Sequence, residues 1–255
     1  MHAPVSISPN MRVLDVVDQN YIYATVLRFF GVDFYRHPEN TLGQICQEKG
    51  IDYQKLLKHF RTAPFQNLLE TSFVEDYPID IVLEFLKDSH QQFIWHQLPY
   101  IADLIANIDP IHFDHPELAK DLKFVFPLFA EDFIRHIYEE EATSFAFIHR
   151  LFRAVERWDF HPGRLFFDLK CNSIKDFAAE HLEEDDEMSG IRELTNNYHI
   201  CSSTSTYTKV IYSELKKFEA DLQIHAHLEN NVLLKKGDEL ETKAWEILDR
   251  LAYHN

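Results

Sequence analysis

Apolar residues in this chain recur mostly three and four positions apart, which is the spacing of one face of an α-helix. Only 6 glycines and 10 prolines occur among 255 residues, so long helical runs are rarely interrupted. Hydrophobic residues make up 45% of the chain and aromatic residues 14%, enough to bury a substantial core. The pattern therefore predicts an all-α protein.

The beginning of the chain is expected to form a small helical domain of residues 1–60. A helical pattern there stops at Gly31, a residue suited to helix C-termini. Thr41 is placed to cap a further helix that ends at Gly50. Residues 61–78 are less periodic, and we assign them to a linker.

The predicted elements become longer in residues 79–255. Four long amphipathic helices are expected, at about residues 81–108, 116–158, 174–197 and 206–235, with a short helix after them. Pro99 is expected to break or kink the first of these helices, and the fourth is expected to end before Gly237. Four long helices joined by modest connections predict an up-down four-helix bundle.

Composition narrows the classes of partner. The formal net charge of -17 would repel a phosphate backbone, so we expect no nucleic-acid partner. The three cysteines, Cys46, Cys171 and Cys201, form no C-x-x-C pattern, which favours reduced thiols over a disulfide framework. No signal peptide and no apolar run of about 20 residues is found, so we expect a cytoplasmic protein that does not enter a membrane.

Histidine is unusually frequent, with 15 in the chain. Each predicted long helix carries one in a mixed or apolar face, and in two helices a glutamate follows one turn later. The candidate metal ligands are His90, His136, Glu140, His181, His225 and Glu229. Four imidazoles and two carboxylates in one bundle core would be costly to bury without a metal ion.

Spacing alone does not establish such a site. With 15 histidines and 42 acidic residues, about two or three histidines would have an acid four positions later by chance, and the chain has three. The alternative is that each histidine is a solvated or singly hydrogen-bonded residue. The H-E-x-x-H motif of zinc proteases and the E-x-x-H motif of ferritin-like bundles are not the pattern here.

Two strings carry a resemblance to a known family. His136 to Glu141 reads H-I-Y-E-E-E, and His225 to Leu234 reads H-A-H-L-E-N-N-V-L-L. They resemble the H-x-x-x-E-E and H-x-x-L-E-N-N-V-L-F-P strings of the hemerythrin-like iron-sulfur cluster repair family, also called RIC (repair of iron centres). Leu234 and Lys235 stand where that family has Phe and Pro.

The resemblance extends to the other two predicted long helices. Seven residues separate His90 from Leu98-Pro99, where the family has six, and Glu180-His181 is similar to the family's Glu-His pair. In the small domain, Tyr35 and Arg36 occupy the places of two adjacent family cysteines. A role in packing or partner docking is therefore expected for that domain.

The resemblance implies a hemerythrin-like bundle that holds two iron ions in an oxo- or hydroxo-bridged di-iron centre. Glu140 and Glu229 would bridge the irons, and the four candidate histidines would bind at their ends. The implied function is protection or repair of iron-sulfur clusters under nitrosative or oxidative stress, by iron donation or by chemistry on NO or O2. Iron-sulfur proteins would be partners, a homodimer is open, and Glu141 is a candidate for proton transfer.

A second hypothesis belongs to another class of function. In it the protein is a non-enzymatic sensor of O2, NO or iron, and the metal-binding bundle controls how the small domain docks onto a partner.

Overall fold

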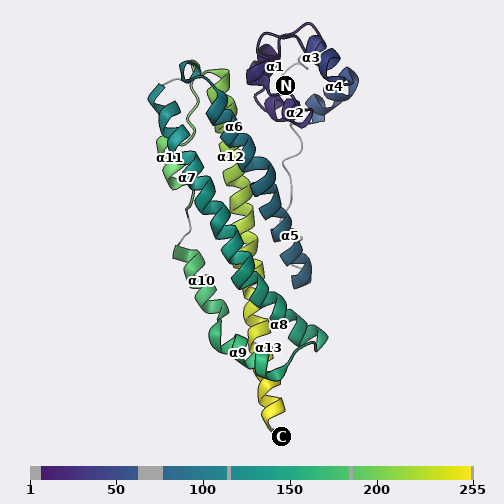
Figure 1. Cartoon of the computed structure of the whole chain (residues 1–255), viewed down its shortest axis with the longest axis vertical. Coiled ribbons are helices and arrows are strands. Elements are labelled where there is room, and N and C mark those ends of the chain that lie inside the picture. Colours follow the sequence, from purple (N-terminus) through teal and green to yellow (C-terminus); the bar gives the residue numbers. More distant parts are fainter. Residues whose placement is uncertain (1–6, 63–76, 114–115, 184–185, 254–255) are drawn as a thin grey trace. The chain divides into compact units, whose positions relative to one another are not determined.

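The computed structural model describes residues 7–62, 77–113, 116–183 and 186–253 (Figure 1). All regular elements in these ranges are helical, apart from one isolated bridge between Arg12 and Thr41. The all-α prediction is confirmed. The predicted linker coincides largely with residues 63–76, which lie outside the described ranges.

The chain forms two compact units, and each combines several segments. The first contains residues 1–69, 100–125 and 191–217, and the second contains residues 70–99, 126–190 and 218–255. The domain boundaries expected from the sequence, at residues 60 and 78, stay a prediction.

Short helices form the N-terminal part of the first unit: α1 (Val13–Gln19), α2 (Tyr23–Phe29), the 3-10 turn η1 (Phe34–Arg36), α3 (Leu42–Lys49) and α4 (Tyr53–Thr62). The predicted cap of α3 is present, because Thr41 and Gln44 form a reciprocal capping box. Gly50 closes the same helix in the left-handed conformation, with φ 64°. We call residues 7–62 the N-terminal module.

The N-terminal module is joined to two longer helices of its own unit, α6 (Leu98–Asn107) and α12 (Thr206–Leu228). The hydroxyl of Tyr35 donates a hydrogen bond to the carboxylate of Asp103 on α6. Arg28 and Arg36 lie 3.7 Å from the same carboxylate. Thr25 donates to Glu214 on α12. Tyr35 thus fastens the module to α6.

The second unit is built from helices around one apolar core. Its elements are α5 (Ile79–Gln92), the end of α7 (Pro116–Glu140), α8 (Ala146–Arg157), α9 (Pro162–Cys171), α10 (Ile174–Glu183), the end of α12, and α13 (Leu234–Tyr253). α13 packs against α8, α9 and α10, and α5 packs against α8. Leu86, Leu151 and Leu228 are fully buried in the shared core, and burial of each such side chain stabilises the fold by about 1.5–3 kcal/mol.

Three five-residue π-helical segments interrupt the long helices. They are η4 (Phe93–Gln97), η6 (Glu141–Phe145) and η7 (Glu229–Leu233). A break or kink is predicted at Pro99, and the structure has the π segment η4 just before it. The amide of Leu98 donates a hydrogen bond to the carbonyl of Phe93, five residues earlier, so the wider turn precedes the proline. η4 joins α5 directly to α6, and η6 joins α7 directly to α8, so the first and second long helices each continue without a break.

Two of the expected helix boundaries are wrong. The third long helix is divided into α10 and α11 (Ser189–Leu194), and positive φ angles at Asn196 and Asn197 end it before the expected residue. Gly237 does not end the fourth helix, because it lies buried inside α13. A Cβ atom there would be 3.1 Å from Ile174 and 3.3 Å from Ile148, so this glycine allows close packing of helices.

Candidate metal centre

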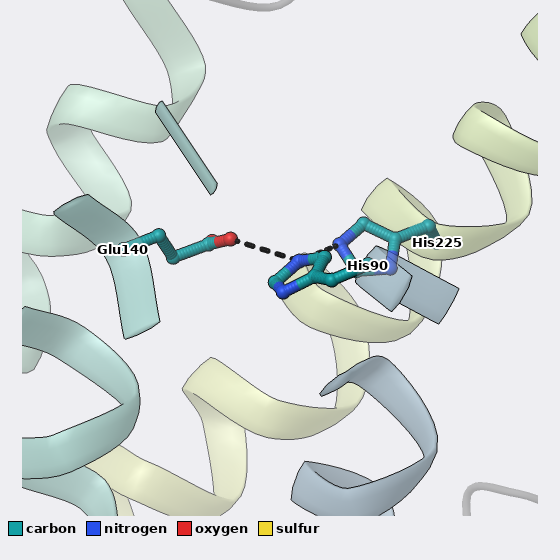
Figure 2. A group of neighbouring side chains, drawn as sticks. All are labelled: His90, Glu140 and His225. Carbon is teal, nitrogen blue, oxygen red and sulfur yellow. Dashed lines mark hydrogen bonds and ion pairs between the residues drawn. The ribbon is translucent and has the colours of Figure 1, made fainter. Parts of the chain in front are cut away.

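Three helices of the second unit bring a histidine, a glutamate and a second histidine together. His90 comes from α5, Glu140 is the last residue of α7, and His225 lies in α12. One ligand atom from each lies within 4.8 Å of the other two (Figure 2). The Nε2 atom of His90 is 3.3 Å from Oε2 of Glu140 and 3.1 Å from Nε2 of His225. Three of the six candidates predicted from the sequence are therefore close together in the structure.

These side chains are withdrawn from water. His90 is 1% exposed, His225 6% and Glu140 7%. Figure 2 shows the Glu140 carboxylate and the His225 ring both approaching His90, with the two dashed lines meeting at one nitrogen of the His90 ring. A buried carboxylate that faces two imidazoles is a donor set of nitrogen and oxygen atoms that suits iron or zinc.

Glu229 adds a second carboxylate to this group. It stands one helical turn after His225, and its Oε2 lies 3.6 Å from Nε2 of that histidine. Only 1% of Glu229 is exposed. The i, i+4 pair seen in the sequence is thus directed inward.

The remaining two predicted ligands differ in what the structure says of them. His136 is half-buried and lines the same cavity, but it is not part of the close cluster. His181 belongs to α10, and its side chain lies outside the described part of the structure. The assignment of both as ligands stays a prediction.

The cluster borders a cavity of about 70 Å³. Its lining residues are His90, Phe133, His136, Ile137, Glu140, Glu187, Leu222, His225, Ala226 and Glu229. Glu187 was not singled out in the sequence. It ends the acidic run E-E-D-D-E, in which no periodic pattern distinguishes one acid from its neighbours.

Aromatic side chains close one side of the centre. Phe93, Phe133 and Phe218 pack with ring centroids 5.4–5.8 Å apart. Phe93 also meets the His225 ring edge-on at 5.6 Å. This apolar shell limits access of water, which strengthens electrostatic interactions inside the site.

Each π segment begins at or just after a residue of the candidate site. η6 begins immediately after Glu140, η7 begins at Glu229, and η4 begins three residues after His90. The hydroxyls of Thr143 and Ser144 donate to the backbone carbonyls of Glu139 and Glu140, 2.7 and 3.2 Å away. Such segments are rare and occur often at functional sites.

Residues next to the candidate ligands have other surroundings. His227 is exposed and lies 3.1 Å from the side-chain amide of Asn231. His96 is also exposed. Glu141, by contrast, contacts His90: its Oε1 is 2.8 Å from Nδ1 of that ring.

The residues present fit a bound metal. Two imidazoles and two carboxylates are buried with their ligand atoms facing one another, and a bare set of this kind carries a large desolvation cost. A cation would offset that cost. The buried His-Glu-His group thus supports metal binding, and the number of ions is a separate question.

The sequence is similar to those of curated iron-sulfur cluster repair proteins. No protein-family model matches the sequence. The iron-sulfur cluster repair protein ScdA of Staphylococcus haemolyticus is 19% identical over 88% of this chain and 96% of its own length. ScdA of Staphylococcus epidermidis is 20% identical with the same coverage. The repair protein YtfE of Yersinia pseudotuberculosis is 22% identical over 81% of this chain and 86% of its own length.

The chain is a distant, nearly full-length homologue of the iron-sulfur cluster repair (RIC) family. Its long helices accordingly form a hemerythrin-like bundle with additional N-terminal helices. The resemblance stated from the sequence is confirmed. Across the described residues, every helix is too short or too polar to cross a membrane.

Proposed function

We propose that this RIC homologue is a cytoplasmic di-iron protein that protects or repairs iron-sulfur clusters under nitrosative or oxidative stress. The observation that carries the proposal is the buried group of His90, Glu140 and His225. Its support is the similarity of the chain to iron-sulfur cluster repair proteins along nearly the whole length of those relatives.

The proposed centre uses six side chains. The carboxylates of Glu140 and Glu229 and the imidazoles of His90, His136, His181 and His225 would hold two irons. Bound iron would supply redox chemistry and affinity for NO or O2, and it could be donated to a damaged cluster. Iron-sulfur proteins are the proposed macromolecular partners.

The protein's own residues would control what reaches the centre. The cavity of about 70 Å³ has room for ions, water and diatomic molecules but not for a substrate of drug-like size. The packed rings of Phe93, Phe133 and Phe218 exclude water on one side. The buried carboxylates Glu140 and Glu229 supply negative charge that favours cations.

Metal analysis of protein purified from iron-replete cells tests this proposal. The expected result is about two irons per chain for the wild type, together with optical and EPR spectra of coupled irons. Glu140→Ala and Glu229→Ala should each lose most of the metal. His227→Ala is the matched control, because this exposed histidine lies two residues from His225 and should retain the wild-type metal content.

The contrary results are equally clear. A correctly folded wild type that holds no iron after reconstitution, or that holds zinc alone, would overturn the proposed function. Equal metal loss in His227→Ala would show that the site residues were misassigned.

One observation favours the second candidate, a non-enzymatic sensor. α12 carries Glu214, which accepts a hydrogen bond from Thr25 of the N-terminal module, and the same helix carries His225. A change at the metal could therefore alter the contacts of the module. Hydrogen exchange of the module in ferrous and ferric protein tests this: a sensor predicts different protection, and identical protection contradicts it.

A further inference from the structure

The imidazole of His90 is held on both of its nitrogen edges and on one face. Its Nε2 faces Glu140 and His225, as described above. Its Nδ1 lies 2.8 Å from Oε1 of Glu141. The ring of Phe145 stacks on it, with centroids 5.4 Å apart and planes 14° from parallel. Four surrounding side chains thus leave the ring little freedom.

The geometry of these contacts favours a proton on Nδ1 of His90. Both ring nitrogens face a carboxylate, but Nδ1 lies 2.8 Å from Oε1 of Glu141, whereas Nε2 lies 3.3 Å from Oε2 of Glu140. The shorter contact is the better hydrogen bond, so we assign Nδ1 as the donor to Glu141. The lone pair of the neutral ring is then on Nε2, the atom that faces Glu140. That is the tautomer required for a metal ligand at Nε2.

The local helix geometry explains how two consecutive glutamates serve one histidine. Successive side chains of an α-helix diverge by about 100°, and α7 changes to the π segment η6 between Glu140 and Glu141. Glu140 is 7% exposed and faces the cavity, whereas the side chain of Glu141 is 32% exposed and faces the outer edge of His90. η6 also supplies Phe145, so one short segment provides two of the contacts that orient His90.

We propose that Glu141 is a positioning residue that sets the tautomer and ring orientation of His90, and so raises the affinity of the centre for its metal. The inference rests on the proposed function only in the identity of the metal. It gives Glu141 a role different from proton transfer: Glu141 holds a proton on Nδ1 of His90 and does not exchange it during a reaction.

Ferrous-ion affinity is the first readout, measured anaerobically by competition with a chromophoric chelator. Glu141→Ala should weaken binding about 10- to 100-fold, the range found when such outer partners are removed. Glu141→Gln should weaken it less, because its amide oxygen still accepts from Nδ1. Glu139→Ala is the matched control: Glu139 is exposed and should leave the affinity unchanged.

The tautomer of His90 in metal-free protein is the second readout, measured at pH 8 by long-range proton-nitrogen NMR. The wild type and Glu141→Gln should show the proton on Nδ1, and Glu141→Ala should show a mixture or the Nε2 form. A wild-type His90 protonated at Nε2 overturns the proposal without any variant. So does a folded Glu141→Ala protein that binds ferrous ion as tightly as the wild type.

The two readouts separate this proposal from the proposed function. A wild type that binds no iron but carries the Nδ1 proton on His90 would contradict the di-iron function, while the tautomer set by Glu141 would stand. Normal iron binding with His90 protonated at Nε2 would support the di-iron function and contradict the positioning role of Glu141.

Discussion

Polar side chains gather in each of the two units, and the two clusters differ in how much water reaches them. In the second unit, His90, Glu140 and Glu229 are at most 7% exposed. In the first, the Asp103 side chain is 24% exposed, and its partners Arg28 and Arg36 are 39% and 54% exposed. The buried cluster carries a desolvation cost that a cation would offset, whereas the half-exposed cluster is satisfied by the protein's own opposite charges.

This difference separates a binding site from a structural contact. Ion pairs open to solvent stabilise a fold modestly and need no ligand. Buried carboxylates beside imidazoles are retained at a cost to stability when they serve function. Substitution in the buried cluster should therefore lower metal affinity with little loss of metal-free stability. Substitution in the half-exposed cluster should lower stability and leave metal affinity unchanged.

The largest difference between the effect on metal affinity and the effect on stability is expected at Glu229. Glu229→Gln should lower ferrous-ion affinity by at least about 100-fold, because Glu229 is proposed as a direct ligand and such a ligand matters more than an outer partner. In the metal-free protein the same change should leave the free energy of unfolding unchanged or raise it by about 1 kcal/mol, since a buried charge is removed. Chelator competition and urea denaturation measure the two quantities. Glu239→Gln, at an exposed position of α13, is the control.

A loss of several kcal/mol of metal-free stability in Glu229→Gln would break the comparison. It would mean that the carboxylate serves the fold in the absence of metal.

At Asp103 we expect a smaller effect, and it should fall on stability and not on metal affinity. Burial and the hydrogen bond to Asp103 raise the pKa of Tyr35, which keeps this phenol protonated as the donor. Asp103→Asn should lower the free energy of unfolding by about 1–2 kcal/mol, through a weakened hydrogen bond and lost ion pairs. Iron affinity should not change. Asp88→Asn, an exposed residue of α5, should have no effect on stability.

The smallest effect concerns the cysteines, and it tests the same distinction between exposed and buried groups. Hydrogen bonds from Ser203 and Thr204 lower the pKa of the exposed Cys201 thiol to about 7, whereas burial raises the pKa of Cys46. The thiolate is the reactive form, so alkylation of Cys201 should accelerate as pH rises through about 7. Peptide mapping after brief iodoacetamide treatment should find Cys201 modified well before Cys46. Equal rates would contradict these assignments.

The sequence predicted the fold class because long amphipathic patterns depend on local periodicity. It also supplied His90, Glu140 and His225 as candidates, although their spacing alone was no better than chance. Only the family strings separated them from other histidines. The close approach itself depends on packing between helices distant in sequence, which no local pattern encodes.

The π segments explain what the sequence could not show. Seven residues separate His90 from Leu98-Pro99, one more than the resemblance implies, and the π segment η4 lies within that interval. In the same way, η6 begins at Glu141, so the contact of Glu141 with His90 could not be read from a regular helix. Glu187 was missed because it lies in a turn just before α11, outside any helical pattern.

The most direct test of the central claim is anomalous diffraction at the iron absorption edge from crystals of iron-loaded protein. Two iron peaks per chain are expected beside Glu140 and Glu229, with His90, His136, His181 and His225 as the nitrogen ligands. A single peak, or iron bound only at surface carboxylates while the buried cluster stays empty, would contradict it.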